Sequence, residues 1–330
     1  MPILPPGIQS NNLAGFPQIA YEKTAIREFQ ANTPYLSELC DMFPMQKRSG
    51  RTNQFYGQKP FGPSTTTATE GIPGPSLSLS QVISQTYLSQ FTDWLGVSDI
   101  ANDMFISNIV VDATRNLAYR GALTANLVAS SAFEAAATLD ATARIDLGDS
   151  EFVSGYTLRR AETSLVNNNV PGRSDGQYTC VMSALTSYDL FSDNSAGGVT
   201  DVLKRTPQGV TELKDGIVRS FSILEWSGVR ILRTSTVPVT AGYPSAGKNG
   251  YSTLVVGREA MLASQLSGVN VPKDPNFAVR VTYLDTPDLS NPTLQTAALV
   301  SMNWFLGVAP RPNTQGTSAF RRVRAEASIV

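Results

Sequence analysis

The sequence predicts an α+β fold in two lobes with extended arms, and three observations point to it. Ile106, Ile109, Val110, Ala113 and Leu117 form one apolar stripe at helical spacing, which predicts a long helix. Shorter apolar or alternating runs later in the chain predict strands. The chain has 330 residues, more than the roughly 250–300 that one hydrophobic core usually serves, so two lobes are expected.

Composition narrows the function. Lys and Arg number 26 against 27 Asp and Glu, a net charge of −1, which argues against nucleic acid as the main partner. Charged residues make up 16%, below the ~25% of ordinary soluble proteins, which suits a surface covered by other molecules. The absence of histidine excludes histidine-dependent nucleophilic catalysis and imidazole metal sites. We therefore expect no enzymatic activity, no cofactor and no metal site.

The two cysteines and the chain's hydropathy bear on its compartment. Cys40 and Cys180 are too few for a disulfide framework or a metal cluster, and their apolar neighbours favour buried thiols, although one disulfide stays open. The N-terminal residues lack a basic segment and are broken by prolines, so we expect no signal peptide. No apolar run reaches the ~18–20 residues of a membrane-spanning helix.

The first 93 residues read as an arm followed by a long excursion. Residues 1–48 form the arm, with a short helix that begins at Thr33 and Pro34 and ends at Pro44. Residues 49–93 run out as one strand, pass through a Gly/Pro/Thr-rich tip and return as a second strand. An isolated hairpin is marginally stable in water, so this one is expected to lie on a neighbouring chain; a surface loop is the alternative.

The remaining elements alternate between helix and strand. The long helix is expected over 99–130, capped by Ser98 or Asp99, and a second helix over 150–167. A strand over 178–182 and a helix over 183–190 follow, and then strands within 217–239 and over 251–256. A short helix is expected over 259–266, and strands over 279–284, 294–308 and 319–330.

Three local patterns could carry chemistry, and each has a simpler interpretation. Residues 242–249 have the spacing of a phosphate-binding loop, and Ser245 with Lys248 matches a serine–lysine pair, yet a strand follows and Pro244 removes a donor amide. A turn between two strands fits better. Asp189 and Asp193 share one helix side, typical of a solvated helix end. The arginines of 319–330 sit on a strand where charge discourages edge pairing.

The order of parts, together with local sequence, resembles the major capsid proteins of tailed bacteriophages, which share the Hong Kong 97-like fold, in the branch of N-four-type phages. The resemblance covers roughly residues 30–325. The matching stretches, given by their first residue, are Arg48-Ser-Gly-Arg-Thr-Asn-Gln-Phe, Glu70-Gly-Ile-Pro, Phe91-Thr-Asp-Trp, Val97-Ser-Asp, Ser174-Asp-Gly-Gln-Tyr-Thr-Cys-Val, Tyr188-Asp-Leu-Phe-Ser-Asp, Trp226-Ser-Gly-Val-Arg-Ile and Leu289-Ser-Asn-Pro.

The resemblance implies a division of the chain. It makes 1–48 the N-terminal arm, 49–93 the E-loop, 94–147 the peripheral domain with its spine helix, 148–293 the axial domain and 294–330 a return to the peripheral domain. Contacts between copies are then expected at Arg48, Arg51, Lys59, Phe61, Glu70, Tyr87, Arg321, Arg322 and Arg324. Lys59 is expected to form no covalent cross-link, because no acid that could catalyse one is identifiable.

The implied function is that of a shell subunit. Copies would form hexamers and pentamers of an icosahedral head around double-stranded DNA, with separate scaffolding and portal proteins, decoration proteins and non-specific DNA contact. The chain would assemble in the host cytoplasm and reside in the virion. An encapsulin-like compartment shell or another virion protein is the main alternative, and a nucleotide-binding enzyme using 242–249 is a distant one.

Overall fold

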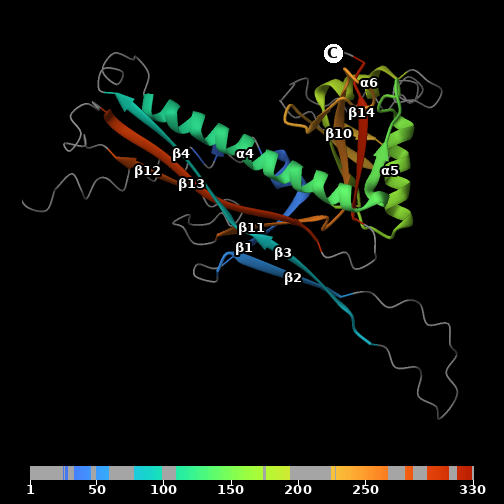
Figure 1. Cartoon of the computed structure of the whole chain (residues 1–330), viewed down its shortest axis with the longest axis horizontal. Coiled ribbons are helices and arrows are strands. Elements are labelled where there is room, and N and C mark those ends of the chain that lie inside the picture. The colour runs from blue at the N-terminus through green and yellow to red at the C-terminus, as the bar shows by residue number, and fades with distance from the viewer. Residues whose placement is uncertain are drawn as a thin grey trace, which may run out of the picture.

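The computed structural model of the chain is built around two β-sheets, with a long helix lying along one of them and reaching the other (Figure 1). It describes residues 25, 27–28, 33–45, 50–58, 78–98, 109–173, 176–193, 224–226, 228–266, 279–284, 296–311 and 318–328. No helix within these ranges is both long enough and apolar enough to cross a membrane.

The first sheet has five strands, and the long strand β13 (Thr296–Pro310) pairs with three of the others. Met302, Trp304 and Leu306 alternate along β13 and are buried, as expected for a strand with one face on a core. Within the described part of this sheet, β1 and β11 pair in parallel and the other pairs are antiparallel. The other members are β1 (Cys40–Met45), β4 (Ser89–Ser98), β11 (Met261–Leu266) and β12 (Val279–Leu284).

The second sheet has seven strands, and both of its faces are covered. Leu254 and Val256 of β10 face the long helix, whereas Val255 faces α5 (Gly155–Asn167) and α6 (Ala184–Ser192). The strands are β5 (Arg144–Asp146), β6 (Tyr178–Ser183), β7 (Leu224–Trp226), β8 (Val229–Thr234), β9 (Val239–Ala241), β10 (Asn249–Val256) and β14 (Phe320–Glu326).

The long helix α4 spans Ile109–Leu139, so it continues past the predicted end at 130, and residues 99–108 of the predicted range lie outside the described residues. Ser98 ends strand β4 instead of capping a helix. At ~1.5 Å per residue, the 31 residues of α4 span about 46 Å. Its buried stripe consists largely of small side chains, which let the backbone lie close to the sheets: Ala113, Leu117, Ala118, Ala122, Ala125, Ala129, Phe133 and Ala136.

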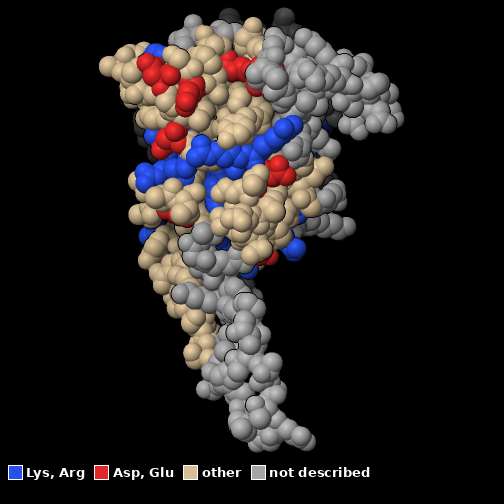
Figure 2. All heavy atoms as spheres, turned by 90° about the vertical axis from the view of Figure 1, so that its right-hand side faces the viewer, with Lys and Arg blue, Asp and Glu red and all other residues tan. Residues whose placement is uncertain are grey.

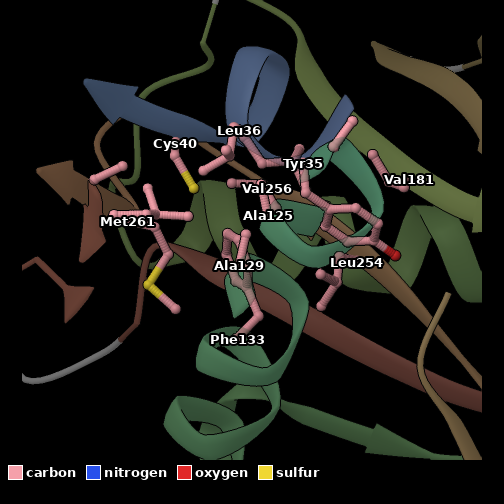
Figure 3. Close-up of a cluster of buried hydrophobic side chains, with 14 of the residues drawn as sticks. Tyr35, Leu36, Cys40, Ala125, Ala129, Phe133, Val181, Leu254, Val256 and Met261 are labelled. Atoms are coloured by element: carbon pink, nitrogen blue, oxygen red, sulfur yellow. The ribbon is translucent and has the colours of Figure 1, made fainter. Parts of the chain in front are cut away.

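One apolar core joins the two sheets. Tyr35 of the short helix η1 (Tyr35–Leu39) lies close to Val181 and Leu254 of the second sheet, and Leu36 belongs to the same cluster (Figure 3). Phe133 of α4 meets Phe320 of β14 edge-on, with 5.2 Å between ring centroids. Residues of both sheets belong to this core. The arm segment around η1 therefore packs against both sheets.

Two predicted helical segments are strands over part or all of their length. The helix expected to run from Thr33 to Pro44 ends at Leu39, and the chain continues as β1 through Pro44. Pro44 is tolerated because, among the described strands, β1 pairs only with β11, so its other edge needs no donor there. The helix expected over 259–266 is wrong, because β11 occupies 261–266 and pairs with both β1 and β13.

The remaining elements lie close to their predicted places. Helix α5 begins after Ser154, whose hydroxyl accepts a bond from the Thr157 amide at 3.3 Å, later than the predicted 150. Gly228 and Gly242 have positive φ of 76°, in agreement with the turns expected there. Strand β14 lies in the second sheet while β13 lies in the first.

Asp140 connects the end of α4, through the short helix η2 (Ala141–Ala143), to the start of β14. Its carboxylate accepts bonds from the amide and hydroxyl of Thr142 (2.9 and 2.7 Å) and of Ser318 (2.9 and 2.6 Å). Partial burial raises the pKa of Asp140, but these four bonds outweigh it and hold the pKa at about 2.

This lowered pKa predicts a stabilisation that depends on acidity. Because the pKa in the folded state lies below the unfolded value of about 3.9, the stabilisation is present above about pH 4 and is lost as the pH falls toward 2. Asp140→Asn should lower the unfolding free energy near pH 7 by about 1 kcal/mol, a value discounted for exposure, and this gap should close toward pH 2. Urea unfolding of both proteins between pH 7 and 2 measures it, and a gap that stays constant with pH would contradict the assignment.

Candidate assembly surface

The excursion predicted from the sequence is a two-stranded hairpin of β2 (Thr52–Gln58) and β3 (Gln81–Tyr87). The strands pair antiparallel, from Thr52 opposite Tyr87 to Gln58 opposite Gln81. Figure 1 shows the hairpin projecting from the first sheet, away from the second. The tip between the strands, with Lys59, Phe61 and Glu70, lies outside the described residues, and so does Arg48.

The inner face of the hairpin is fixed to the first sheet by polar contacts. Thr86 and Asn53 both bond to the Ser264 hydroxyl of β11, at 2.9 and 3.0 Å. Ser84 donates to the carbonyl of Pro310 at 2.6 Å. Gly307 of β13 comes so close to the hairpin base that a Cβ there would lie 2.5 Å from the Tyr87 carbonyl oxygen. These bonds orient the base of the hairpin.

The outer face of the hairpin exposes apolar and amide side chains. Tyr56 is 61% exposed, and Ile83, directly opposite it, is 54% exposed. Tyr87 is 66% exposed and donates to Gln85 at 3.2 Å, as Tyr56 does to Gln54 at 2.7 Å. This uncharged face, here called the hairpin face, consists of Thr52, Gln54, Tyr56, Gln81, Ile83, Gln85 and Tyr87. Large exposed apolar side chains that gather on one element are typical of a surface that binds another protein.

Further exposed apolar side chains, which were not among the predicted contact residues, lie on the first sheet and on α4. Trp94 of β4 is 68% exposed, and Leu127 of α4 is 65% exposed. Tyr119 is 49% exposed and lies two helical turns before Leu127, on the same side of α4. Tyr119 and Leu127 lie off the buried stripe of α4, and large apolar residues outside that stripe are the signal that could have revealed them.

The three C-terminal arginines have partners within the chain. Arg322 is 2% exposed and donates to Glu134 of α4 at 2.8 Å and to Asp146 of β5 at 2.7 Å. Arg324 donates to the same Glu134 oxygen at 3.0 Å. Arg321 points to the opposite face of the sheet, where its Nε donates to Ser164 of α5 at 2.9 Å and burial lowers its pKa.

These positions correct two predictions. The fully buried Arg321 and Arg322 are not available to another copy, and β14 lies between β5 and β10 instead of at a sheet edge. Arg322 joins α4 to the second sheet through its bond to Glu134, and Arg321 joins α5 to the same sheet through its bond to Ser164. Arg51 lies beside the hairpin, and its carbonyl accepts a bond from the Leu88 amide at 2.8 Å. Of the predicted contact residues that the structure describes, Arg51 and Tyr87 are exposed.

Solved structures with the same architecture belong to phage capsids. The capsid of Ralstonia phage GP4 is similar at 12% identity with a TM-score of 0.69, covering 91% of each chain. The capsid of cyanophage Pam1 is similar at 12% identity with a TM-score of 0.61, covering 91% of this chain and 93% of that chain. The capsid of cyanophage P-SCSP1u is 15% identical with a TM-score of 0.57, covering 88% and 87%.

The chain has a phage capsid fold. It is the Hong Kong 97-like α+β fold expected from the sequence resemblance, and that prediction is confirmed. No protein-family model and no curated protein matches the sequence. The likeness to the capsid structures is therefore carried by the backbone arrangement, at 12–15% identity.

In this capsid fold the loop 242–248 is a tight connection between β9 and β10. The amide of Gly242 bonds to the carbonyl of Lys248 at 2.8 Å. The ammonium of Lys248 contacts Asp149 and lies 2.8 Å from Glu326, and both contacts raise its pKa. Two carboxylates thus neutralise the lysine that a phosphate-binding loop would need, in agreement with the turn between strands expected from the sequence.

The carboxylates singled out from the sequence serve the fold. Asp189 is buried, and its carboxylate accepts bonds from the amide and the hydroxyl of Ser328, which fixes the end of the chain to α6. A solvated helix end was therefore the wrong interpretation for Asp189. Among the described residues no group of three or more His, Cys, Asp and Glu side chains could hold a metal ion.

Charges of both signs share the side of the molecule that carries α5. Figure 2 shows a band of Lys and Arg side chains across this face and Asp and Glu side chains beside the band. Helix α5 exposes Arg159 and Arg160 on its outer side. Charged side chains of both signs therefore lie next to one another on this face.

Proposed function

We propose that this chain is the major capsid protein of a tailed bacteriophage, a structural subunit without catalysis. Copies assemble through hexamers and pentamers into the icosahedral head that encloses the double-stranded DNA genome. Assembly takes place in the host cytoplasm and the product is the virion shell. The observation that carries the proposal is the hairpin face, an uncharged exposed surface held away from the chain's own core on a capsid fold.

The hairpin acts as the E-loop of this subunit and covers an adjacent copy. Its inner face is occupied by bonds to Ser264 and Pro310, so the outer face is the one left for a neighbour. Tyrosine and isoleucine supply large contact area, and the glutamines supply hydrogen bonds at the same surface. Arg51, beside the base of the hairpin, adds a charge that can pair with a carboxylate of the neighbouring copy.

The partners follow from the same proposal. Scaffolding, portal and decoration proteins are separate chains, and the packaged DNA makes non-specific contacts with the inner surface. The mixed charge of the side carrying α5 favours contact between copies there over contact with DNA.

Light scattering on a sizing column, with negative-stain microscopy of the same fractions, tests the proposal. We expect megadalton material consisting of regular closed particles. Analysis of their contents then separates a phage head, which contains or admits DNA, from a compartment shell, which contains a cargo enzyme. A monomer of 35.5 kDa at every concentration and ionic strength tried, with no particles even when the separate scaffolding protein is present, would argue against a shell subunit.

A further inference from the structure

The segment Tyr35–Met45 passes from one sheet body to the other. Its first half, η1, is buried in the core between α4 and the second sheet, and the amide of Tyr35 bonds to Asn126 of α4 at 3.4 Å. Its second half, β1, is a strand of the first sheet and pairs with β11. The two halves meet at Leu39 and Cys40. The conformation of the chain at this junction therefore affects how the first sheet is oriented relative to the second.

Arg173 holds this junction from the side of the second sheet. It lies in the connection between α5 and β6, and its guanidinium is largely buried. Nη1 donates to the carbonyl of Leu39 at 2.9 Å, and Nη2 donates to the carbonyl of Cys40 at 2.9 Å and to Asp41 at 3.2 Å. One planar fork thus satisfies two consecutive carbonyls where η1 ends and β1 begins, and a lysine cannot reproduce that geometry.

A second arginine of the same sheet reinforces the contact. Arg230 of β8 donates to Glu38 of η1 at 3.2 Å, one residue before the carbonyls that Arg173 binds. Apolar packing around Tyr35 holds the two bodies together, but such packing is not directional. Charge-assisted hydrogen bonds have preferred distances and angles, so they define one orientation among those that the apolar core would permit.

We propose that Arg173, supported by Arg230, is a positioning residue that fixes the angle between the two sheet bodies. As an extension that rests on the proposed function, this angle determines the curvature of the shell. Every copy contributes both sheet bodies to a shell, so the angle between the two bodies sets how adjacent copies tilt relative to each other. A wider range of this angle would permit shells of several diameters.

The angle can be measured in the unassembled subunit by pulsed electron paramagnetic resonance. Spin labels are attached through Thr92→Cys on β4 and Thr163→Cys on α5, both exposed and on different bodies. Cys40 and Cys180 stay unlabelled because they are buried, and burial raises the pKa of the Cys40 thiol to about 12. Arg173→Met removes the donors at similar size, Arg173→Lys keeps the charge without the fork, and Arg160→Met on the outer side of α5 is the matched control.

We expect a narrow distance distribution in the otherwise unchanged protein and in the Arg160→Met control. The distribution should become at least twice as wide in Arg173→Met and partly widened in Arg173→Lys. Unchanged distributions in both Arg173 variants would overturn the proposal. Loss of the folded subunit in both variants would overturn it too, because Arg173 would then support the fold and not the angle.

The extension to curvature has its own readout. Particles of Arg173→Lys should differ from the parent particles by a several-fold larger share of aberrant diameters in electron micrographs. Particles of uniform parent diameter, formed by a variant whose distance distribution is widened, would contradict the link to curvature. Failure of the proposed function is distinguishable, because the parent protein would then form no shells while the distance measurement on the subunit still applied.

Discussion

Replacing Ile83 and Tyr87 together by glutamate should abolish shell assembly and leave the subunit folded. Both side chains lie on the outer face of the hairpin, 54% and 66% exposed, so new charges there remain in water in the free subunit. In a shell the same positions would be covered by a neighbouring copy, and a buried charge without a partner costs several kcal/mol per subunit. The measurement is light scattering on a sizing column, with circular dichroism to verify the fold.

Conservative changes at the same positions provide the control. Ile83→Val with Tyr87→Phe preserves most of the apolar area and should still assemble. Deletion of residues 59–76, the tip of the excursion, should likewise give a soluble folded subunit without closed shells. Normal particles from the double glutamate variant would show that the hairpin face does not contact another copy.

Replacing Arg322 by alanine should lower the free energy of unfolding by about 2–3 kcal/mol. This is less than the ~3–5 kcal/mol expected when one partner of a fully buried ion pair is removed, because the Glu134 and Asp146 side chains are 21% and 39% exposed. The substitution deprives Glu134 and Asp146 of their bonds at 2.8 and 2.7 Å and leaves a cavity between α4 and β14. Of the Glu134 carboxylate's contacts with described residues, the bond to Arg324 would remain. Urea unfolding of the unassembled subunit, analysed by linear extrapolation, measures the change.

Arg115→Ala is the matched control for this experiment. Arg115 also pairs with an aspartate, Asp112 of the same helix, but at 3.7 Å and with both side chains about half exposed. Exposed pairs contribute only about 0–1 kcal/mol, so this variant should be nearly as stable as the parent. Equal, small effects of the two substitutions would mean that the charges around Glu134 do not join α4 to the second sheet.

The elements with strong periodicity could be predicted from the sequence. The apolar stripe of α4 and the apolar run of β13 are long enough to be identified without knowledge of their neighbours. The hairpin was predictable for the opposite reason: its strands had too few apolar residues to form a core, and the structure indeed leaves Tyr56 and Ile83 exposed.

What could not be predicted depends on partners distant in sequence. The six residues of β11 are too few for a period to distinguish helix from strand, and their state is decided by pairing with Cys40–Met45 and with the end of β13. The three arginines of β14 are interspersed with apolar residues in the way expected for a strand at the solvent-exposed edge of a sheet. Arg322 is buried only because Glu134 and Asp146, more than 170 positions earlier, lie beside it in the fold.

The central claim is that copies of this chain form a shell in which the hairpin face of one copy is covered by the next. Cryo-electron microscopy of the assembled particles tests it most directly. We predict an icosahedral reconstruction in which Tyr56, Ile83 and Tyr87 are buried against a neighbouring subunit while Ser264 still bonds to the inner face of the hairpin. Particles in which these three side chains remain in solvent, or in which β2 and β3 contact only their own subunit, would contradict it.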